Sequence, residues 1–221
     1  MLFCATGALF EARPHAAEGL PETVRHWHTT QGLDVLEPGF VEFPVEDAAS
    51  LPGVVTKFSA VRDGQAVLVK FSPADASAAS QRWRDLLVCE GLALQTLAAA
   101  GVSAAHTVIE QAAGRVFLES RRFDRTPQGG RVGMVSLEVY DRQYIGQGSN
   151  WVDTAQRSDR AGPERLHPDD VHSIGLLDAF GALIANTDRH HGNLSLLLQD
   201  HRWRLAPAYD MLPMLYAPVA G

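Results

Sequence analysis

Apolar and polar side chains alternate over two neighbouring stretches in the first half of the chain. These stretches, Val54–Val61 and Gln65–Phe71, are rich in β-branched residues and are separated by Arg62-Asp63-Gly64. An Asp-Gly pair between two such runs favours the tight turn of a β-hairpin. The pattern therefore predicts two antiparallel strands joined by this turn.

Two longer stretches carry apolar residues at the three- and four-residue spacing of an α-helix. The first, Ala78–Ala100, is followed by Gly101, which suits the position just past a helix C-terminus. The second begins at His167 and runs to Asn186, with Pro168 in its first turn and two carboxylates near the positive end of the helix dipole. The apolar faces comprise Trp83, Leu86, Leu87, Cys89, Ala93, Leu94 and Leu97 in the first helix, and Val171, Ile174, Leu177, Phe180, Leu183 and Ile184 in the second.

Shorter apolar runs bounded by turn residues predict further strands. Together with the two helices they indicate an α+β fold class. The stretch Arg121–Gly130 is polar and rich in turn residues, so we expect a hinge between two lobes there. The further predicted strands are Gly39–Val45, Val102–Ile109, Arg115–Leu118, Leu194–Leu198 and Trp203–Leu205.

The bulk composition argues against some classes of protein. The chain has 221 residues, of which 46% are hydrophobic and 20% charged, as is ordinary for a globular protein with a sizeable core. The formal net charge of −7 argues against broad electrostatic binding of nucleic acid, which needs an excess of Lys and Arg. The densest basic cluster is Arg121, Arg122 and Arg125.

The cysteines and the first residues indicate a cytoplasmic protein. Cys4 and Cys89 are the two cysteines of the sequence, so no disulfide framework is implied. Met1–Phe10 is apolar, but it lacks the positively charged region that begins a secretory signal. No apolar run approaches the roughly 18 to 20 residues that a membrane span requires.

Three oxygen-bearing side chains follow the second predicted helix in an order typical of phosphoryl transfer. Asp188 stands five residues before Asn193, and Asp210 lies beyond the predicted hairpin. Protein kinases use an aspartate for the incoming hydroxyl, an asparagine five residues later for magnesium, and a later aspartate for the metal. Each of these residue types, like Asn186, also forms turns by itself. Their combination and order favour the catalytic interpretation.

His190 and His191 raise the alternative of a zinc site. Adjacent histidines in an extended loop point apart, and neither a His-Glu-x-x-His pattern nor a cysteine pair lies nearby. We therefore expect these histidines to position Asp188 or Asn193, or to be exposed loop residues.

Lys70, near the end of the second predicted strand, and Glu90, in the first predicted helix, form another candidate group. In protein kinases a strand lysine contacts the phosphates of ATP and pairs with a helix glutamate. The alternative is a solvated lysine at a strand edge and a glutamate on the helix surface. We expect a Lys70–Glu90 pair.

Two further segments provide candidate nucleotide contacts. Gly53 lies in a turn that enters the first strand, where backbone amides and Lys57 would meet phosphates. At the predicted hinge, the backbone of Arg121 and Phe123 would bind adenine, and Asp124 a ribose hydroxyl. The alternatives are a plain turn and a salt-bridged surface segment.

Taken in order, five segments resemble the HipA-like serine/threonine kinases, the toxin partners of bacterial toxin–antitoxin pairs. The most specific are Asn186-Thr-Asp188-Arg-His-His-Gly-Asn193 and Leu205-Ala-Pro-Ala-Tyr-Asp210. The resemblance implies a bilobed protein-kinase-like fold, ATP and Mg²⁺ as cofactors, and transfer of the γ-phosphate to a protein serine. The other matching segments are Ser50-Leu-Pro-Gly-Val-Val-Thr-Lys57, Val67-Leu-Val-Lys70-Phe71 and Arg122-Phe123-Asp124-Arg125.

The same resemblance implies roles for single residues and partners for the chain. Ser50 aligns with a serine whose autophosphorylation switches some members off. The implied partners are a protein substrate, which in the family includes aminoacyl-tRNA synthetases, and a helix-turn-helix antitoxin. The implied roles are phosphate anchoring for Lys70, backbone contacts to adenine for Arg121 and Phe123, ribose binding for Asp124, catalysis for Asp188, and magnesium binding for Asn193 and Asp210.

We expect three parts of the chain: residues 1–49 of uncertain fold, a sheet-rich N-lobe with the hinge at 50–125, and a helical C-lobe at 126–221. Because the family normally continues well past the metal-binding aspartate, we expect this C-lobe to be incomplete. Two other functions stay open. One is a truncated, inactive remnant that binds nucleotide or a partner, and the other is a small-molecule kinase similar to aminoglycoside phosphotransferases.

Overall fold

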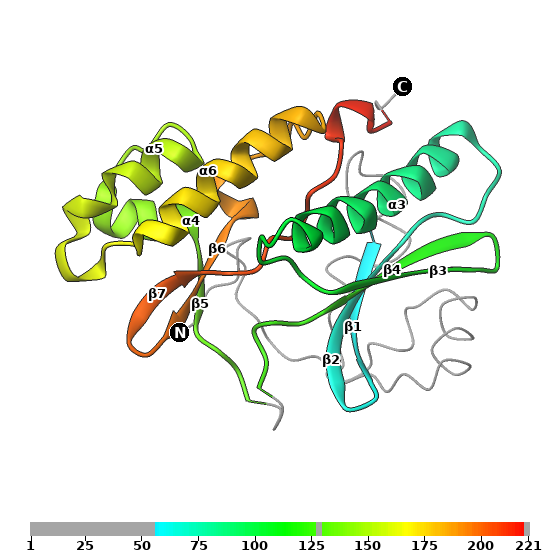
Figure 1. Cartoon of the computed structure of the whole chain (residues 1–221). Helices are drawn as coiled ribbons and strands as arrows, with labels where there is room; N and C mark the ends of the chain where they lie inside the picture. Colours follow the sequence, from blue (N-terminus) through cyan, green and yellow to red (C-terminus); the bar gives the residue numbers. More distant parts are fainter. Residues whose placement is uncertain (1–55, 127–129, 219–221) are drawn as a thin grey trace. The chain divides into compact units, whose positions relative to one another are not determined.

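The computed structural model describes residues 56–126 and 130–218, whose positions divide between two compact units (Figure 1). We call them the first and the second unit. The first contains residues 56–95, 105–122 and 216–218, and the second contains Thr96–Ala104 and the described part of Phe123–Leu215.

Some predictions concern residues that the structure does not describe. They are those for segment 1–49, with its strand Gly39–Val45, and those for Ser50 and Gly53. The domain boundaries expected from the sequence likewise stay a prediction.

The first unit is built on a four-stranded antiparallel sheet. Its strands are β1 (Thr56–Arg62), β2 (Gln65–Phe71), β3 (Thr107–Ala112) and β4 (Arg115–Arg121). They lie in the order β1-β2-β4-β3. The predicted hairpin is confirmed, and its turn residues Asp63 and Gly64 have positive φ angles of 50° and 74°.

Helix α3 (Ala78–Ala99) packs on one face of this sheet (Figure 1). Its buried Leu87 belongs to one apolar cluster with Leu118 of β4. The helix approaches the sheet so closely at Gly91 that an added Cβ would lie 2.7 Å from the Cδ1 of Ile109. A side chain at Gly91 would therefore have to displace Ile109.

The opposite face of the sheet carries a separate apolar cluster. Because neighbouring residues of a strand point to opposite faces, Lys70 projects to the same face as Leu118, its partner in β4, and towards α3. The cluster on the other face comprises Phe58, Ala60, Val67, Val69, Phe71 and Phe117.

Strand β3 begins at Thr107 rather than at Val102, so the predicted start is wrong. Residues 102–104 belong to the second unit, where Ala104 forms a bridge with Ala208. The Ala208 N–H also donates to the Ser103 carbonyl at 2.9 Å. Pairing with Ala208, more than a hundred residues along the chain, thus explains why this segment does not extend β3.

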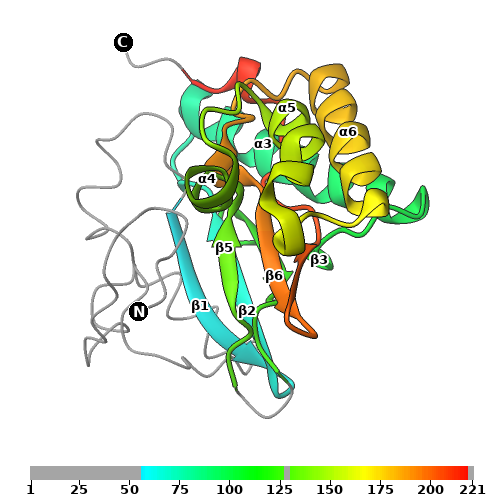
Figure 2. The ribbon, with the colours of Figure 1, turned by 90° about the vertical axis from the view of Figure 1, so that its left-hand side faces the viewer.

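The second unit contains a three-stranded antiparallel sheet and several short helices (Figure 2). Its strands are β5 (Met134–Ser136), β6 (Ser195–Gln199) and β7 (Arg202–Leu205), in this order. The predicted β6–β7 hairpin is confirmed. The short segments Met134–Ser136, Leu137–Tyr140 and Trp151–Gln156 have too few residues for a periodic pattern, so the sequence does not predict their structure. The helices are α4 (Leu137–Tyr140), α5 (Trp151–Gln156) and α6 (Pro168–Leu183), with shorter or irregular turns at η1 (Asp141–Ile145), η2 (Arg157–Glu164), η3 (His191–Asn193) and η4 (Met214–Tyr216).

Helix α6 begins where the sequence predicts and ends earlier. His167 caps its N-terminus through the ring nitrogen Nδ1. The helix stops at Leu183, because Ala185 adopts a left-handed φ of 59°. The Asn186 N–H then donates to the Gly181 carbonyl at 2.8 Å and closes the helix end. The predicted end at Asn186 is therefore wrong, and the following loop leaves α6 through this turn.

The sequence predicts no membrane-spanning segment. Within residues 56–126 and 130–218, no helix combines the length and the apolar character needed to cross a lipid bilayer.

Candidate active site

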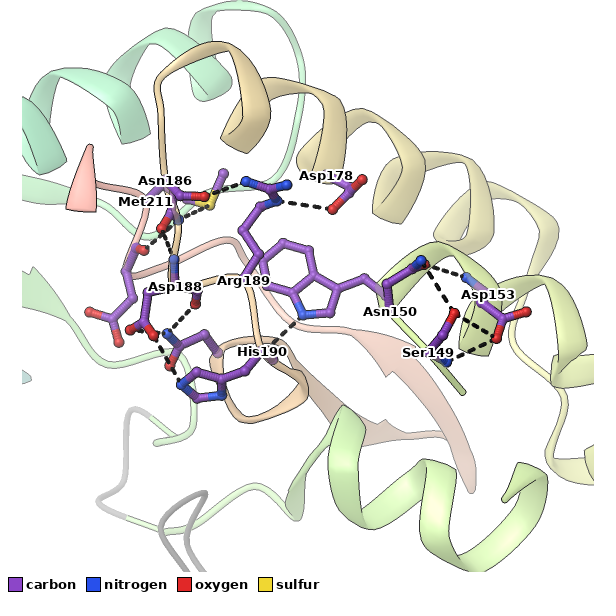
Figure 3. A network of polar contacts seen from close by, with 12 residues as sticks. Ser149, Asn150, Asp153, Asp178, Asn186, Asp188, Arg189, His190 and Met211 are labelled. Carbon is purple, nitrogen blue, oxygen red and sulfur yellow. Dashed lines mark hydrogen bonds and ion pairs between the residues drawn. The ribbon is translucent and has the colours of Figure 1, made fainter. Parts of the chain in front are cut away.

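The loop between α6 and β6, residues 184–194, carries Asp188 and Asn193 and is stabilised from within (Figure 3). The Asn193 amide Nδ2 donates to the Asp188 carbonyl at 2.9 Å and to its carboxylate Oδ2 at 3.0 Å. Both amide hydrogens therefore face Asp188, and the Oδ1 of Asn193 is left as an acceptor for a cation. The Asp188 side chain is 49% exposed, so a hydroxyl substrate can reach it.

Asn186 connects this loop to the segment that carries Asp210. Figure 3 shows Asn186 beside Asp188 and Met211. Its Oδ1 accepts from the Asp188 N–H at 3.0 Å, and its Nδ2 donates to the Asp210 carbonyl at 3.4 Å. The residue is 1% exposed, so these contacts replace its hydrogen bonds with water. Asn186 forms the local turn that its residue type suggests, and it also links two candidate site residues. No site role is predicted for Asn186 from the sequence, and the only signal for one is its position two residues before Asp188.

Asp210 itself lies in an unusual backbone conformation. Its φ is 54°, a left-handed value that is uncommon for a residue other than glycine. The neighbouring Tyr209 holds the turn, since its hydroxyl lies 2.6 Å from the Ser195 Oγ and donates to the Gly192 carbonyl at 3.3 Å. Strained turns of this kind cluster at functional sites.

The two histidines of the α6–β6 loop take part in its hydrogen bonds. The His190 carbonyl accepts from the Trp151 indole Nε1 at 2.8 Å, and the His190 Nε2 lies 3.7 Å from the Asp188 Oδ1. The His191 Nε2 lies 2.9 Å from the Thr154 Oγ1. Among the described residues, no group of three His, Cys, Asp or Glu could hold a metal ion. Both histidines contact the residues that shape the loop.

Arg189 ties the loop back to α6 (Figure 3). Its Nε donates to the Asp178 Oδ1 at 3.1 Å, and its Nη1 donates to the Asn186 carbonyl. A Cβ at Gly181 would lie 2.5 Å from the Arg189 Cδ. Helix α6 therefore has a glycine where the arginine crosses it.

In the first unit, Lys70 and Glu90 form the expected ion pair. The Lys70 Nζ lies 2.7 Å and 2.9 Å from the two carboxylate oxygens of Glu90. Their side chains are 12% and 2% exposed, so the alternative of two solvated surface residues is wrong. Burial with two hydrogen bonds fixes the ammonium group in one position.

Lys57 is the residue opposite Lys70 in the β1–β2 ladder. Opposed residues of an antiparallel pair project to the same face, with Cβ atoms about 4.5 to 5.5 Å apart. The two lysine side chains therefore project to the same face of the sheet, where the Lys70 ammonium group is paired with Glu90.

Two hinge candidates lie in different units. The Arg121 N–H donates to the His106 carbonyl at 2.9 Å, so a contact from Arg121 to adenine would have to use its carbonyl oxygen. Phe123 belongs to the second unit, and its ring centroid lies 5.9 Å from that of Tyr209. Phe123 thus packs beside the residue that precedes Asp210.

Asp124, the candidate for ribose binding, is buried and charged. Its Oδ2 accepts from the Arg125 Nη1 at 2.5 Å. The alternative from the sequence is a salt bridge at the surface. The salt bridge is present, but Asp124 is only 9% exposed and therefore does not lie at the surface. The ion pair holds the carboxylate in place, and a ribose contact by Asp124 stays a prediction.

Comparison with known proteins finds relatives for most of the chain. Residues 49–220 match the family model of the HipA-like C-terminal domain. The toxin YjjJ of Escherichia coli K12 is 41% identical over 153 residues, which make up 69% of this chain and 34% of that protein. The chain thus spans about a third of the length of this curated relative.

Two solved structures share the fold. The proinflammatory kinase CtkA of Helicobacter pylori matches with a TM-score of 0.53 and 18% identity, over 72% of this chain and 54% of that one. HipA of Shewanella oneidensis MR-1, solved with HipB and operator DNA, matches with a TM-score of 0.56 and 18% identity, over 78% of this chain and 46% of that one. The predicted α+β, protein-kinase-like fold class is therefore confirmed.

Proposed function

The chain belongs to the family of HipA-like C-terminal domains, and on this premise we propose that it transfers the γ-phosphate of ATP to a serine of a protein substrate. We propose further that it acts in the cytoplasm as the toxin of a toxin–antitoxin pair. Its family and its similarity to the toxin YjjJ support this role.

The observation that carries the proposal is the link through Asn186. One buried amide binds the backbone of Asp188 and that of Asp210. In phosphoryl transfer the protein contributes mainly positioning and charge stabilisation. The Asn186 amide links Asp188, the proposed base, to Asp210, the proposed metal ligand, and so helps both positioning and charge stabilisation.

In this mechanism Asp188 orients the serine hydroxyl and accepts its proton. The carboxylate is suited to this role because it is half exposed and because Asn193 donates to only one of its oxygens, Oδ2. Lys70 contacts the phosphates of ATP, and Glu90 holds the ammonium group in place. Lys57 adds a second positive charge on the same sheet face.

Asn193 and Asp210 fit a magnesium ion by their donor atoms. The Asn193 amide nitrogen is used by Asp188, which leaves the oxygen Oδ1 for the metal, and Asp210 adds a carboxylate. Magnesium in phosphoryl-transfer sites takes one or two carboxylates together with water and substrate phosphates. When bound, the ion neutralises charge on the β- and γ-phosphates.

The remaining nucleotide contacts follow the family resemblance. We propose that Gly53 meets the phosphates, that Arg121 and Phe123 offer backbone groups to adenine, and that Asp124 binds ribose. Ser50 is the proposed site of regulatory phosphorylation.

The proposed partners are a helix-turn-helix antitoxin and a substrate of the aminoacyl-tRNA synthetase class. The complex of the Shewanella HipA with HipB supports an antitoxin partner. The net charge of −7 supports a chain that does not bind nucleic acid directly.

Incubation with Mg²⁺ and γ-labelled ATP tests the function. Label on the protein, located by mass spectrometry, and release of ADP are the readouts. We expect Asp188→Asn to lower the rate about 10² to 10⁴-fold while ATP affinity changes little, because the carboxylate acts on the hydroxyl. Asp200→Asn is the matched control, since Asp200 is exposed in the β6–β7 turn.

Equal turnover of Asp188→Asn and the parent would remove Asp188 from the mechanism. Nucleotide binding without any transfer would favour the inactive remnant. Transfer to a small hydroxyl compound in a substrate screen, with no label on protein, would favour the small-molecule kinase.

A further inference from the structure

Three polar groups form a chain of hydrogen bonds from η1 through α5 to the α6–β6 loop. The Thr154 Oγ1 lies 3.0 Å from the Asp141 Oδ1 and 2.9 Å from the His191 Nε2. Thr154 is 0% exposed and Asp141 is 8% exposed. The network therefore lies inside the second unit, and the mechanism above does not use it.

Counting hydrogens gives the direction of each bond. The Asp141 Oδ1 accepts from the Gly148 N–H at 3.0 Å as well as from the Thr154 hydroxyl. The single hydroxyl hydrogen of Thr154 is used in that bond, so its oxygen can only accept from His191. The hydrogen of the second bond must therefore sit on the Nε2 of His191. The network selects one form of the imidazole.

The turn after η1 is built to fit this arrangement. A Cβ at Gly148 would lie 1.8 Å from the Thr154 Oγ1 and 2.7 Å from the Asp141 Oδ1. Gly146 and Gln147 both have positive φ, of 73° and 65°, and turn the chain around the carboxylate. Only a glycine at position 148 lets the backbone donate to Asp141 here.

Helix α5 contacts the α6–β6 loop a second time. Trp151 lies three residues before Thr154, hence on the same side of the helix, and its indole N–H donates to the His190 carbonyl. Asn150 caps the start of α5 by accepting from the Asp153 N–H at 2.9 Å (Figure 3). The helix thus holds two consecutive residues of the loop.

We propose that Thr154 is a positioning residue for phosphoryl transfer that acts through His191. The proposal rests on the proposed function. Asp141 orients the Thr154 hydroxyl, Thr154 holds His191, and His191 fixes the loop between Asp188 and Asn193. Loss of the hydroxyl displaces the Asp188 carboxylate from the incoming hydroxyl group, so it slows the chemical step. The contacts of Lys70 and Asp210 do not depend on the Thr154 hydroxyl, so nucleotide affinity stays close to that of the parent.

The first test separates the hydroxyl from the shape of the side chain. Thr154→Val keeps the volume and removes the hydrogen bonds, and Thr154→Ser keeps the hydroxyl. We expect Thr154→Val to lower kcat about 10- to 100-fold, with the Kd for Mg-ATP within about two-fold of the parent, since small misplacement costs rate. Thr154→Ser should restore most of kcat.

A second pair of variants protects the test against misfolding of Thr154→Val. His191 is only half-buried, so it tolerates change better. His191→Gln keeps an N–H donor for Thr154, and His191→Leu removes it. The glutamine variant should retain most of the rate, and the leucine variant should lose it as Thr154→Val does.

Nitrogen NMR of the parent chain tests the network without reference to activity. The His191 ring should carry its hydrogen on Nε2, and that hydrogen should be protected from exchange. A hydrogen on Nδ1 alone, an unchanged kcat in Thr154→Val and His191→Leu, or a loss that serine does not restore would each overturn the proposal. A parent chain without transfer would overturn the proposed function and the positioning role of Thr154, while the spectrum would still decide whether the network exists.

Discussion

Asn186 offers one acceptor and two donor hydrogens, and the structure uses both kinds of group. The acceptor fixes the backbone of Asp188, and the donor fixes that of Asp210. Thr154 has a comparable role, because its hydroxyl donates to Asp141 and accepts from His191. In both cases an uncharged side chain that can donate and accept hydrogen bonds holds residues with carboxylate side chains in place. A substitution that keeps one function and removes the other separates these roles.

Asn186→Asp is such a substitution. It keeps an acceptor for the Asp188 N–H and places a carboxylate oxygen against the Asp210 carbonyl. We expect it to cost about 1 to 3 kcal/mol of unfolding free energy, as for a buried group left without its partner, and to weaken Mg-dependent ATP binding. Urea unfolding and calorimetric titration measure the two effects.

Asn150→Asp is the matched control. Asn150 is exposed at the N-cap of α5, where asparagine and aspartate are about equally favourable. Equal stability of the two variants would contradict the role given to the Asn186 amide.

At the scale of elements, the Lys70–Glu90 pair joins helix α3 to strand β2. Such a pair gains from two hydrogen bonds, but burial of both charges costs part of that gain. Gly91, next to Glu90 in sequence, allows the close approach of α3 to β3. The position of Glu90 therefore depends on how the whole helix packs.

Glu90→Gln tests this contact. It removes the negative charge from the buried pair with Lys70, so we expect a loss of about 3 kcal/mol in unfolding free energy and weaker ATP binding. Chemical unfolding at several protein concentrations is the measurement. The control is Glu138→Gln in α4, whose exposed pair with Arg142 should contribute about 0 to 1 kcal/mol. An equal loss of unfolding free energy in Glu90→Gln and Glu138→Gln would show that burial of the Lys70–Glu90 pair does not add to its effect on stability.

At the scale of the whole molecule, any ligand that binds the native state stabilises it by mass action. The candidate groups for phosphate and for metal belong to different units of the chain, so each unit can be tested for its part in nucleotide binding. Lys70 represents the first unit and Asp210 the second.

Mg-ATP at about a hundred times its Kd should stabilise the parent chain by about 2.7 kcal/mol. Asp210→Ala should lose the part of this stabilisation that requires magnesium, because the metal would no longer bridge the protein and the phosphates. Thermal unfolding with ATP, with and without Mg²⁺, provides the measurement. The same midpoint with and without magnesium in the parent would speak against a metal at Asp210.

The sequence by itself determined the elements whose signals are local. The β1–β2 hairpin follows from Asp63-Gly64, and the start of α6 follows from His167 with Pro168, because turn and capping interactions act within a few residues. The spacing of Asp188 and Asn193 predicted a site for the same reason, since both belong to one loop.

Only the tertiary structure decided what depends on distant partners. Residues 102–104 lie outside the first sheet because Ala208 pairs with Ala104. Asn186 lies beyond the end of α6, where its side chain contacts the backbone of Asp188 and of Asp210. No local pattern could reveal that Thr154 would lie between Asp141 and His191, since a hydrogen bond between remote segments is chosen by the packing of the whole unit.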